Sequence, residues 1–291
     1  MRIANLSGRA VLLGATKALD IAVASEGAFG PDSQSVWDSW SAFIAWAMPI
    51  EVDSNPAAEG YSQSDLAAPV ARPSQIFAVG LNYADHASEA DMVLPENPLV
   101  FTKFPSSLTG PNATVTLSSD HVDWEAELVV VIGNGGRNIP KSDGWSAVAG
   151  LTVGQDLSDR TVQSWGAPAA QFALGKSFAG YSPTGPAVVT TDEIGATGHL
   201  NSLDITCSVV DPEGGEPRIL QNGNTRDLIF SVPDLVARLS AVVELRPGDL
   251  IFTGTPSGVG MGHKPPQFLK VGQRLTTTIE GVGTITQTLK A

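Results

Sequence analysis

The chain has 291 residues, of which 42% are hydrophobic and 16% are charged, and it contains 30 glycines and 20 prolines. This length permits a large core, and the low charge content together with many turn-forming residues favours short strands over a helical bundle. The formal net charge of −13 at pH 7 argues against nucleic acid and anionic membranes as partners.

An anionic ligand of so acidic a chain would need a local positive charge from a metal ion, a lysine or an arginine. The only cysteine is Cys207, so no intrachain disulfide can form and a reducing compartment is favoured. Met1–Ala10 lacks the pattern of a signal peptide, and no stretch is apolar for long enough to form a membrane helix. We therefore predict a cytoplasmic protein.

The N-terminal region has a pattern of its own, and we place a domain boundary near residue 70. Arg2–Leu13 and Lys17–Val23 are predicted to form short strands, and Ser35–Met48 is predicted to form one helix. The apolar residues that share one face of this helix are Trp37, Trp40, Ile44 and Ala47. Asp53–Pro73 is rich in Ser, Asn, Ala and Pro, which is typical of a linker or surface loop.

From Gln75 onward, apolar and β-branched runs predict a succession of strands. These runs are Gln75–Val79, Leu99–Phe104, Glu127–Ile132, Val148–Val153, Ala187–Thr191, Leu203–Val210, Asp249–Phe252, Arg274–Ile279 and Gly283–Leu289. Their spacing is irregular, and Ser231–Ser240 is the clearest helix among them. An antiparallel or mixed β-rich fold is therefore expected rather than an alternating α/β sheet.

Two glutamates open the most apolar of these runs. Glu125 and Glu127 are two residues apart, so both side chains point to one face of the strand, which continues with Val129 and Val131. Carboxylates directed into an apolar interior repel each other and are costly to desolvate, and a bound dication offsets both effects. Two glutamates at a solvated strand end would give the same sequence, so this pattern alone leaves the metal open.

A third carboxylate strengthens the metal interpretation. Asp156 follows the apolar run Val148–Val153, so it would lie at the end of a neighbouring strand. Three acids on one side would form a facial oxygen site with open positions for water and substrate, which suits Mg²⁺ or Mn²⁺. The alternative is an ordinary aspartate in a turn.

Two further features could carry chemistry. Lys176 lies between apolar residues and could supply positive charge to an anionic oxygen, although a lysine that extends to the surface is the commoner case. His86 and Glu89 are three residues apart, so on a helical turn the carboxylate could orient the imidazole. A solvated pair on a loop helix has the same spacing.

Several segments together resemble a known family. In order they are Gly80–Glu89, Val100–Lys103, Val122–Leu128, Gln155–Arg160, Gly175–Ser177, Pro247–Asp249 and Ile251–Gly260. From about Gln75 to the C-terminus, the chain resembles the fumarylacetoacetate hydrolase family. The resemblance is to its shorter branch of acylpyruvate hydrolases, oxaloacetate decarboxylases and hydroxyheptadienedioate isomerases.

The resemblance implies an α+β, β-rich fold: a mixed β-sheet roll over residues 71–291, preceded by a small N-terminal α/β domain over residues 1–70. It implies Mg²⁺ or Mn²⁺ as the cofactor, with Glu125, Glu127 and Asp156 as ligands. Some relatives have a fourth carboxylate ligand near the segment Asn82–Asp85, and none can be assigned there in this chain.

The resemblance also assigns roles to other residues. The catalytic residues would be His86, Glu89 and Lys176; the substrate contacts would be Arg160, Gln163 and Thr255. Asp159 stands where the family usually has a small residue, so its negative charge beside Arg160 is expected to alter carboxylate binding. Family members are commonly homodimers, and the same is expected here.

The expected activity is hydrolysis of a carbon–carbon bond in an acylpyruvate or another small anionic 2-keto or 1,3-diketo acid, through an enolate that the metal stabilises. Oxaloacetate decarboxylase and 2-hydroxyhepta-2,4-diene-1,7-dioate isomerase activities are alternatives, because they share the enolate. A protein that binds a metal or a small molecule without catalysis is the third possibility.

Overall fold

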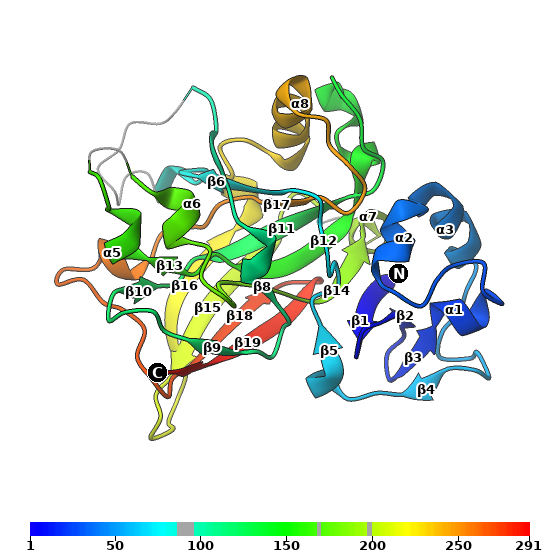
Figure 1. Cartoon of the computed structure of the whole chain (residues 1–291), viewed down its shortest axis with the longest axis horizontal. Coiled ribbons are helices and arrows are strands. Elements are labelled where there is room, and N and C mark those ends of the chain that lie inside the picture. The colour runs from blue at the N-terminus through cyan, green and yellow to red at the C-terminus, as the bar shows by residue number, and fades with distance from the viewer. Residues whose placement is uncertain (86–95, 168–169, 197–199) are drawn as a thin grey trace.

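The computed structural model describes residues 1–85, 96–167, 170–196 and 200–291, and it is organised around two sheets (Figure 1). The large sheet has 12 strands in the order β4-β3-β2-β1-β14-β12-β11-β17-β6-β7, with β5 paired to β1 and β8 paired to β14. Its strands are β1 (Arg2–Leu6), β2 (Arg9–Leu13), β3 (Lys17–Asp20), β4 (Glu59–Gly60), β5 (Leu66–Ala67), β6 (Ile76–Gly80), β7 (Leu99–Thr102), β8 (Leu108–Thr109), β11 (Ala126–Ile132), β12 (Val148–Gln155), β14 (Ser182–Thr190) and β17 (Leu250–Phe252).

The second sheet has five strands in the order β16-β15-β18-β19-β9. These strands are β9 (Thr114–Thr116), β15 (Asp204–Val210), β16 (Arg218–Asn224), β18 (Arg274–Ile279) and β19 (Gly283–Lys290), and a short ribbon joins β10 (Val122–Asp123) to β13 (Ser158–Asp159). The described α-helices are α1 (Ile21–Ala24), α2 (Gln34–Asp38), α3 (Trp40–Ala47), α5 (Arg160–Gln163), α6 (Phe172–Gly175), α7 (Thr191–Gly195) and α8 (Val232–Val242). None of them is long and apolar enough to cross a membrane.

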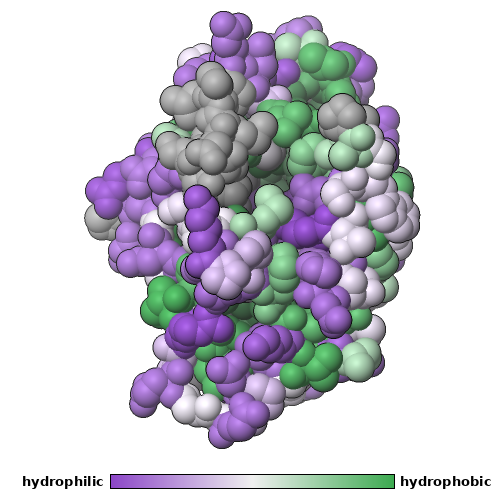
Figure 2. Space-filling model, turned by 90° about the vertical axis from the view of Figure 1, so that its left-hand side faces the viewer, coloured by the Kyte–Doolittle hydropathy of each residue, from purple (hydrophilic) through white to green (hydrophobic). Residues whose placement is uncertain are grey.

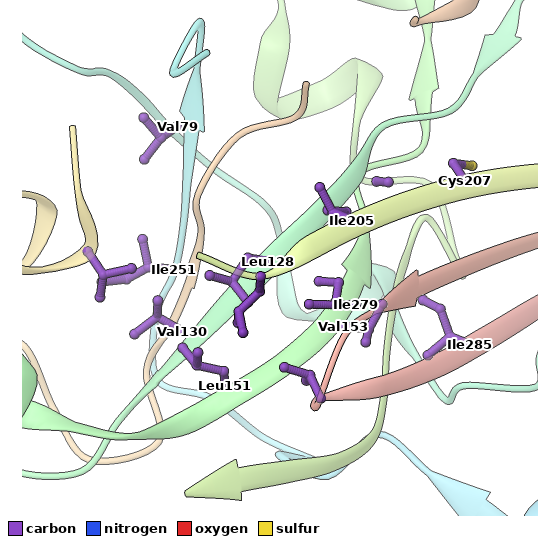
Figure 3. Packing of buried hydrophobic residues seen from close by; sticks show 14 of the residues in the cluster. Val79, Leu128, Val130, Leu151, Val153, Ile205, Cys207, Ile251, Ile279 and Ile285 are labelled. Atoms are coloured by element: carbon purple, nitrogen blue, oxygen red, sulfur yellow. The ribbon is translucent and has the colours of Figure 1, made fainter. Parts of the chain in front are cut away.

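The strand β11 is buried on both of its faces. Leu128 and Val130 belong to a cluster that fills the space between the two sheets, together with Ile205 and Ile285 (Figure 3). Their neighbours Val129 and Val131 point to the opposite face and belong to a second cluster, which includes aromatic residues of α2 and α3. Because successive residues of a strand point to opposite faces, β11 links the two cores.

The N-terminal strands extend the large sheet. Strand β1 pairs with β14 in antiparallel register, with Arg2 opposite Val189, and β2 and β3 follow outward from it. These elements lie at the right of Figure 1, at the opposite end of the molecule from α5 and α6. The division into domains near residue 70 stays a prediction.

The structure confirms the mixed, β-rich α+β fold, while some element boundaries differ from the prediction. The expected strand Lys17–Val23 ends at Asp20, whose side chain accepts a hydrogen bond from the Val23 amide and caps α1. The expected helix Ser35–Met48 is two helices that meet at Ser39. Within α3, Phe43 is fully buried whereas Ile44 is only partly buried.

Candidate functional site

Three acidic side chains meet where β11 begins and β12 ends. Ala126 of β11 pairs with Gln155 of β12, which brings Glu125 and Glu127 beside Asp156. One carboxylate oxygen from each of the three acids lies within 4.8 Å of the others. All three are buried, with exposed fractions of 7%, 1% and 0% for Glu125, Glu127 and Asp156. The three acids predicted from sequence to share a site are therefore brought together.

Two glutamine side chains help to hold the backbone around Glu125. The Glu125 amide donates to Gln155 Oε1 over 2.9 Å, and the Ala126 amide donates to Gln221 Oε1 over 2.9 Å. The Asp156 amide in turn donates to the Glu125 carbonyl oxygen over 2.9 Å. Both glutamines are buried, so these bonds are shielded from water and fix the positions of the acids.

A loop that follows β17 completes this part of the site. The Thr253 hydroxyl donates to the Leu128 carbonyl oxygen over 2.9 Å, and the Gly254 amide donates to Glu127 Oε2 over 2.8 Å. Gly254 has a φ of +98°, and a Cβ at this position would lie 2.9 Å from the Cβ of Asn82. Glycine is therefore needed both for the left-handed backbone and for the close approach.

Two lysines neutralise the acids in part. Lys176 Nζ lies 2.7 Å from Glu125 Oε2 and 2.6 Å from Asp156 Oδ2. Lys103 is completely buried, and its ammonium donates to Asp156 Oδ1 and to the carbonyl oxygen of Lys176. Sequence reasoning does not single out Lys103. The available signal is its position at the end of the motif segment Val100–Lys103, but nothing local reveals that its partner lies 53 residues later.

Arg160 is held by Asp123, a fully buried residue that sequence reasoning also leaves without a role. Nε and Nη2 of Arg160 donate to Asp123 Oδ2 over 2.9 and 2.7 Å. The same Nη2 lies 2.8 Å from Glu125 Oε1, and Nη1 donates to Gln163 Oε1 over 2.8 Å. Of the three predicted substrate contacts, Arg160 therefore lies next to the acids, and Gln163 is hydrogen-bonded to Arg160.

Asp159 precedes Arg160 in the sequence, and its effect on carboxylate binding stays a prediction. Its carboxylate accepts hydrogen bonds from the Val162 amide over 3.0 Å and from the Ser118 hydroxyl over 2.5 Å. It thereby caps the N-terminus of α5, which favours a negative charge. The described ion pairs of Arg160 are instead with Asp123 and Glu125.

Burial dominates the electrostatics of the site. It raises the pKa of Glu127 well above its usual range, and the Asp156 and Glu125 carboxylates raise this pKa further. Burial lowers the pKa of Lys103, and the Asp156 carboxylate opposes that effect only in part. Burial also acts to lower the pKa of Lys176, but its two acidic neighbours outweigh it, so this pKa is raised.

The donor set fits a hard divalent cation. Three carboxylates converge within the reach of one ion, and Oε2 of Glu127 accepts a hydrogen bond from the Gly254 backbone amide. A dication would remove the repulsion and the desolvation cost that raise the pKa of Glu127. Oxygen ligands of this kind suit Mg²⁺ and Mn²⁺.

Two further polar side chains near this loop and strand are buried. Thr255 is buried, and its Oγ1 accepts a hydrogen bond from Gln221 Nε2 over 2.7 Å. Tyr83 is fully buried, and its hydroxyl has no hydrogen-bond partner in the part of the chain that the structure describes. Burial raises the pKa of this phenol, and the Glu127 carboxylate is the next largest cause. His86 and Glu89, the predicted acid–base pair, lie outside the described residues.

Figure 2 looks at the end of the molecule that carries α5 and α6. On this face, strongly hydrophilic side chains alternate with hydrophobic ones.

Residues 75–290 match the family model described as fumarylacetoacetate (FAA) hydrolase C-terminal. The chain belongs to the fumarylacetoacetate hydrolase family. The matched residues include the three acids, both lysines, Arg160 and Thr255.

Relatives within this family carry names of oxaloacetate enzymes. The chain is 46% identical over 226 residues to oxaloacetate tautomerase Fahd2a, mitochondrial, from Rattus norvegicus, which covers 77% of this chain and 69% of the relative. It is 44% identical over the same length to oxaloacetate tautomerase FAHD2A, mitochondrial, from Homo sapiens, with the same coverage.

Solved structures extend the likeness to the whole chain. A crystal structure of a Mycobacterium smegmatis protein described as HpcE is 48% identical, has a TM-score of 0.90 and covers 100% of this chain and 99% of its own. A maleylpyruvate hydrolase from Sphingobium sp. SYK-6, in complex with manganese(II) and pyruvate, is 27% identical with a TM-score of 0.76 and full coverage of both chains.

These findings confirm the predicted family, and the named relatives are enzymes. The roles of the individual site residues, the homodimer and the cytoplasmic location stay predictions. "Mitochondrial" stands in the names of the rat and human relatives and refers to those proteins.

Proposed function

We propose that this chain is a Mg²⁺- or Mn²⁺-dependent enzyme that interconverts the keto and enol forms of a small 2-keto dicarboxylic acid of the oxaloacetate type. The observation that carries the proposal is the buried convergence of three carboxylates beside two lysines. The identity of 46% to an oxaloacetate tautomerase favours tautomerisation over the hydrolysis expected from the sequence.

The charges of the site explain why an anionic acid would bind to so acidic a chain. Three carboxylates face Lys103 and Lys176, while Arg160 is compensated by Asp123, which leaves one net negative charge. A bound dication would turn this balance to one net positive charge in a buried place, where electrostatic interactions are strong. Substrate binding would therefore depend on the metal.

The chain's own groups would then handle the substrate. When bound, the metal would act as a Lewis acid toward the keto and carboxylate oxygens of the substrate. Lys176 would hold its proton at Nζ and stabilise the developing enolate oxygen, and Lys103 would keep Asp156 in place. The hydroxyl of Thr255 and the guanidinium of Arg160 would orient the carboxylates, and His86 with Glu89 would carry the proton of the substrate carbon.

The test is the approach of enol and keto oxaloacetate to equilibrium, followed by ultraviolet absorbance, with Mg²⁺, with Mn²⁺ and with a strong chelator. We expect acceleration with either metal and none with chelator, while the total oxaloacetate stays constant. Release of pyruvate would instead identify a decarboxylase. A rate that is the same with metal, with chelator and without protein would contradict an enzymatic role on this acid and favour a binding protein.

Carbon–carbon bond hydrolysis is the second candidate, supported by the likeness to maleylpyruvate hydrolase in complex with manganese(II) and pyruvate. Its test uses acetylpyruvate and fumarylpyruvate as substrates, with pyruvate release as the readout and the diene-dioate isomerase reaction measured alongside. If His86 is the base that activates water, His86→Ala should lower the hydrolytic rate by about 10²- to 10⁴-fold. An unchanged hydrolytic rate in that variant would remove His86 from the mechanism.

A further inference from the structure

The loop after β17 is attached to β11 at three successive residues. Thr253 bonds to the Leu128 carbonyl oxygen, and the Gly254 amide bonds to the Glu127 carboxylate. The third connection, from Thr255 to the Ala126 amide, runs through a side chain of the other sheet, Gln221 on β16. Gln221 therefore stands between the strand that bears the acids and the residue predicted to contact the substrate.

The hydrogen bonds of Gln221 fix the orientation of its amide. Its Oε1 accepts from the Ala126 amide over 2.9 Å, so the opposite end of the group must be the NH₂. The two hydrogens of Nε2 are then donated to the Pro256 carbonyl oxygen over 2.8 Å and to Thr255 Oγ1 over 2.7 Å. Gln221 is almost fully buried, so water does not compete for these bonds.

The orientation of Gln221 decides which way the Thr255 hydroxyl can donate. Because Thr255 Oγ1 accepts the hydrogen from Nε2, its own proton must point to another acceptor. A ligand carboxylate beside the acids would be such an acceptor. With an apolar group in place of the Gln221 amide, the hydroxyl could turn and donate to a neighbouring carbonyl oxygen instead.

Close packing holds this arrangement in place. A Cβ at Gly258 would lie 2.3 Å from the Leu220 carbonyl oxygen, and a Cβ at Gly223 would lie 2.7 Å from the Cβ of Pro256. The loop and β16 are therefore in direct contact on both sides of Gln221, with little freedom to separate.

We propose that Gln221 is a positioning residue that presets the Thr255 hydroxyl as a hydrogen-bond donor to the substrate carboxylate and couples it to the strand that carries the acids. This inference rests on the proposed function, because it takes the substrate to be a 2-keto acid bound beside the acids. Toward the substrate Gln221 acts through Thr255, while its Oε1 holds the Ala126 amide.

The experiment is a double-mutant cycle on pyruvate binding to the Mn²⁺-loaded protein, measured by calorimetry and by the electron paramagnetic resonance of Mn²⁺. Gln221→Met and Thr255→Val should each weaken pyruvate binding by about 10-fold, since each removes one part of a buried hydrogen bond network. The double variant should be no weaker than Thr255→Val alone. Gln221→Asn, whose shorter amide cannot reach both partners, should behave like Gln221→Met.

The matched control is Gln287→Met, which replaces another fully buried glutamine, on β19, whose amide donates to the Pro111 carbonyl oxygen. It should leave pyruvate binding unchanged, so a loss caused by general destabilisation would appear in both proteins. Equal weakening by Gln221→Met in the presence and absence of Thr255→Val would overturn the coupling while leaving the proposed function intact. A wild-type protein that binds neither Mn²⁺ nor pyruvate would overturn the proposed function, and this inference with it.

Discussion

The two ends of the strand that carries the acids are stabilised in opposite ways. From Leu128 to Ile132, both faces of β11 are packed by apolar side chains, and burial itself is favourable. At Glu125 and Glu127 burial is unfavourable, and Lys176 and Arg160 offset it in part through ion pairs with Glu125. The apolar end holds the fold together, whereas the acidic end is held for chemistry at some cost in stability.

The largest effect is expected at the acidic end. Glu127→Gln should weaken Mn²⁺ binding by at least about 100-fold. Substituting a residue that only hydrogen-bonds to a metal ligand already lowers metal affinity by about 10- to 100-fold, and Glu127 is itself a predicted ligand. The same change should stabilise the metal-free protein by about 1–3 kcal/mol, because it removes a buried charge. Calorimetric Mn²⁺ titration and urea unfolding measure the two quantities. A variant that is both metal-free and less stable than the wild type would contradict this opposition.

The same variant gives a pH dependence. Burial and two neighbouring carboxylates raise the pKa of Glu127 in the folded state, so the folded protein binds more protons than the unfolded chain above the ordinary glutamate pKa. The contribution of Glu127 to the stability of the metal-free protein should therefore fall as the pH rises from the ordinary glutamate pKa toward the raised one. Glu127→Gln should remove this part of the slope. An identical slope in both proteins would show that the pKa of Glu127 in the folded protein is not raised.

At the apolar end we expect the opposite result, a loss of stability without a change in Mn²⁺ affinity. Leu151 of β12 lies opposite Val130 and is fully buried between the sheets. Leu151→Ala should lower the free energy of unfolding by about 2–5 kcal/mol, through lost burial and the cavity that remains. The folded fraction should bind Mn²⁺ as the wild type does. A weakened Mn²⁺ affinity in this variant would show that the two ends are not independent.

A smaller effect is expected beside the acids at Tyr83. Because its buried hydroxyl has no partner among the described residues, Tyr83→Phe should leave the free energy of unfolding unchanged or raise it by about 1 kcal/mol. A protein usually loses stability when a buried, hydrogen-bonded tyrosine is replaced by phenylalanine. A loss of more than about 1 kcal/mol in urea unfolding would reveal a partner for the hydroxyl.

The smallest effect concerns Cys207, which faces the apolar cluster between the sheets. Burial raises the pKa of this thiol to about 12, so almost no thiolate is present near pH 8. A disulfide reagent should therefore modify the native protein only as fast as it unfolds, and should modify the urea-unfolded protein at once. Rapid modification of the native protein would show that the cluster opens locally.

This contrast also explains what the sequence could reveal. β11 and β12 were predictable because their runs of apolar, β-branched residues have few other stable arrangements, and Glu125 and Glu127 stand out against such a run. β16 was not predictable, because the segment Arg218–Asn224 is polar and contains a glycine. Lys103 and Gln221 were missed because their roles depend on partners far along the chain, at Asp156 and Ala126.

The splitting of the predicted helix has a physical reason of the same kind. Trp37 and Trp40 stack with their ring centroids 5.6 Å apart, and Phe43 packs next to Trp40. The break at Ser39 is compatible with packing of these rings against residues of the large sheet. This tertiary packing overrides the helical periodicity of the sequence. Such an override is invisible in a pattern of single residues.

Trp37 and Trp40 share a core cluster with Val129 and Val131, on the reverse side of β11. A shortened chain that begins at residue 75, where the family match starts, would lack both tryptophans. It would also leave β14 without its neighbour β1. An unpaired strand edge next to newly exposed apolar surface favours aggregation. Protein engineering or inhibitor screening directed at the acids should therefore retain the residues that precede residue 75.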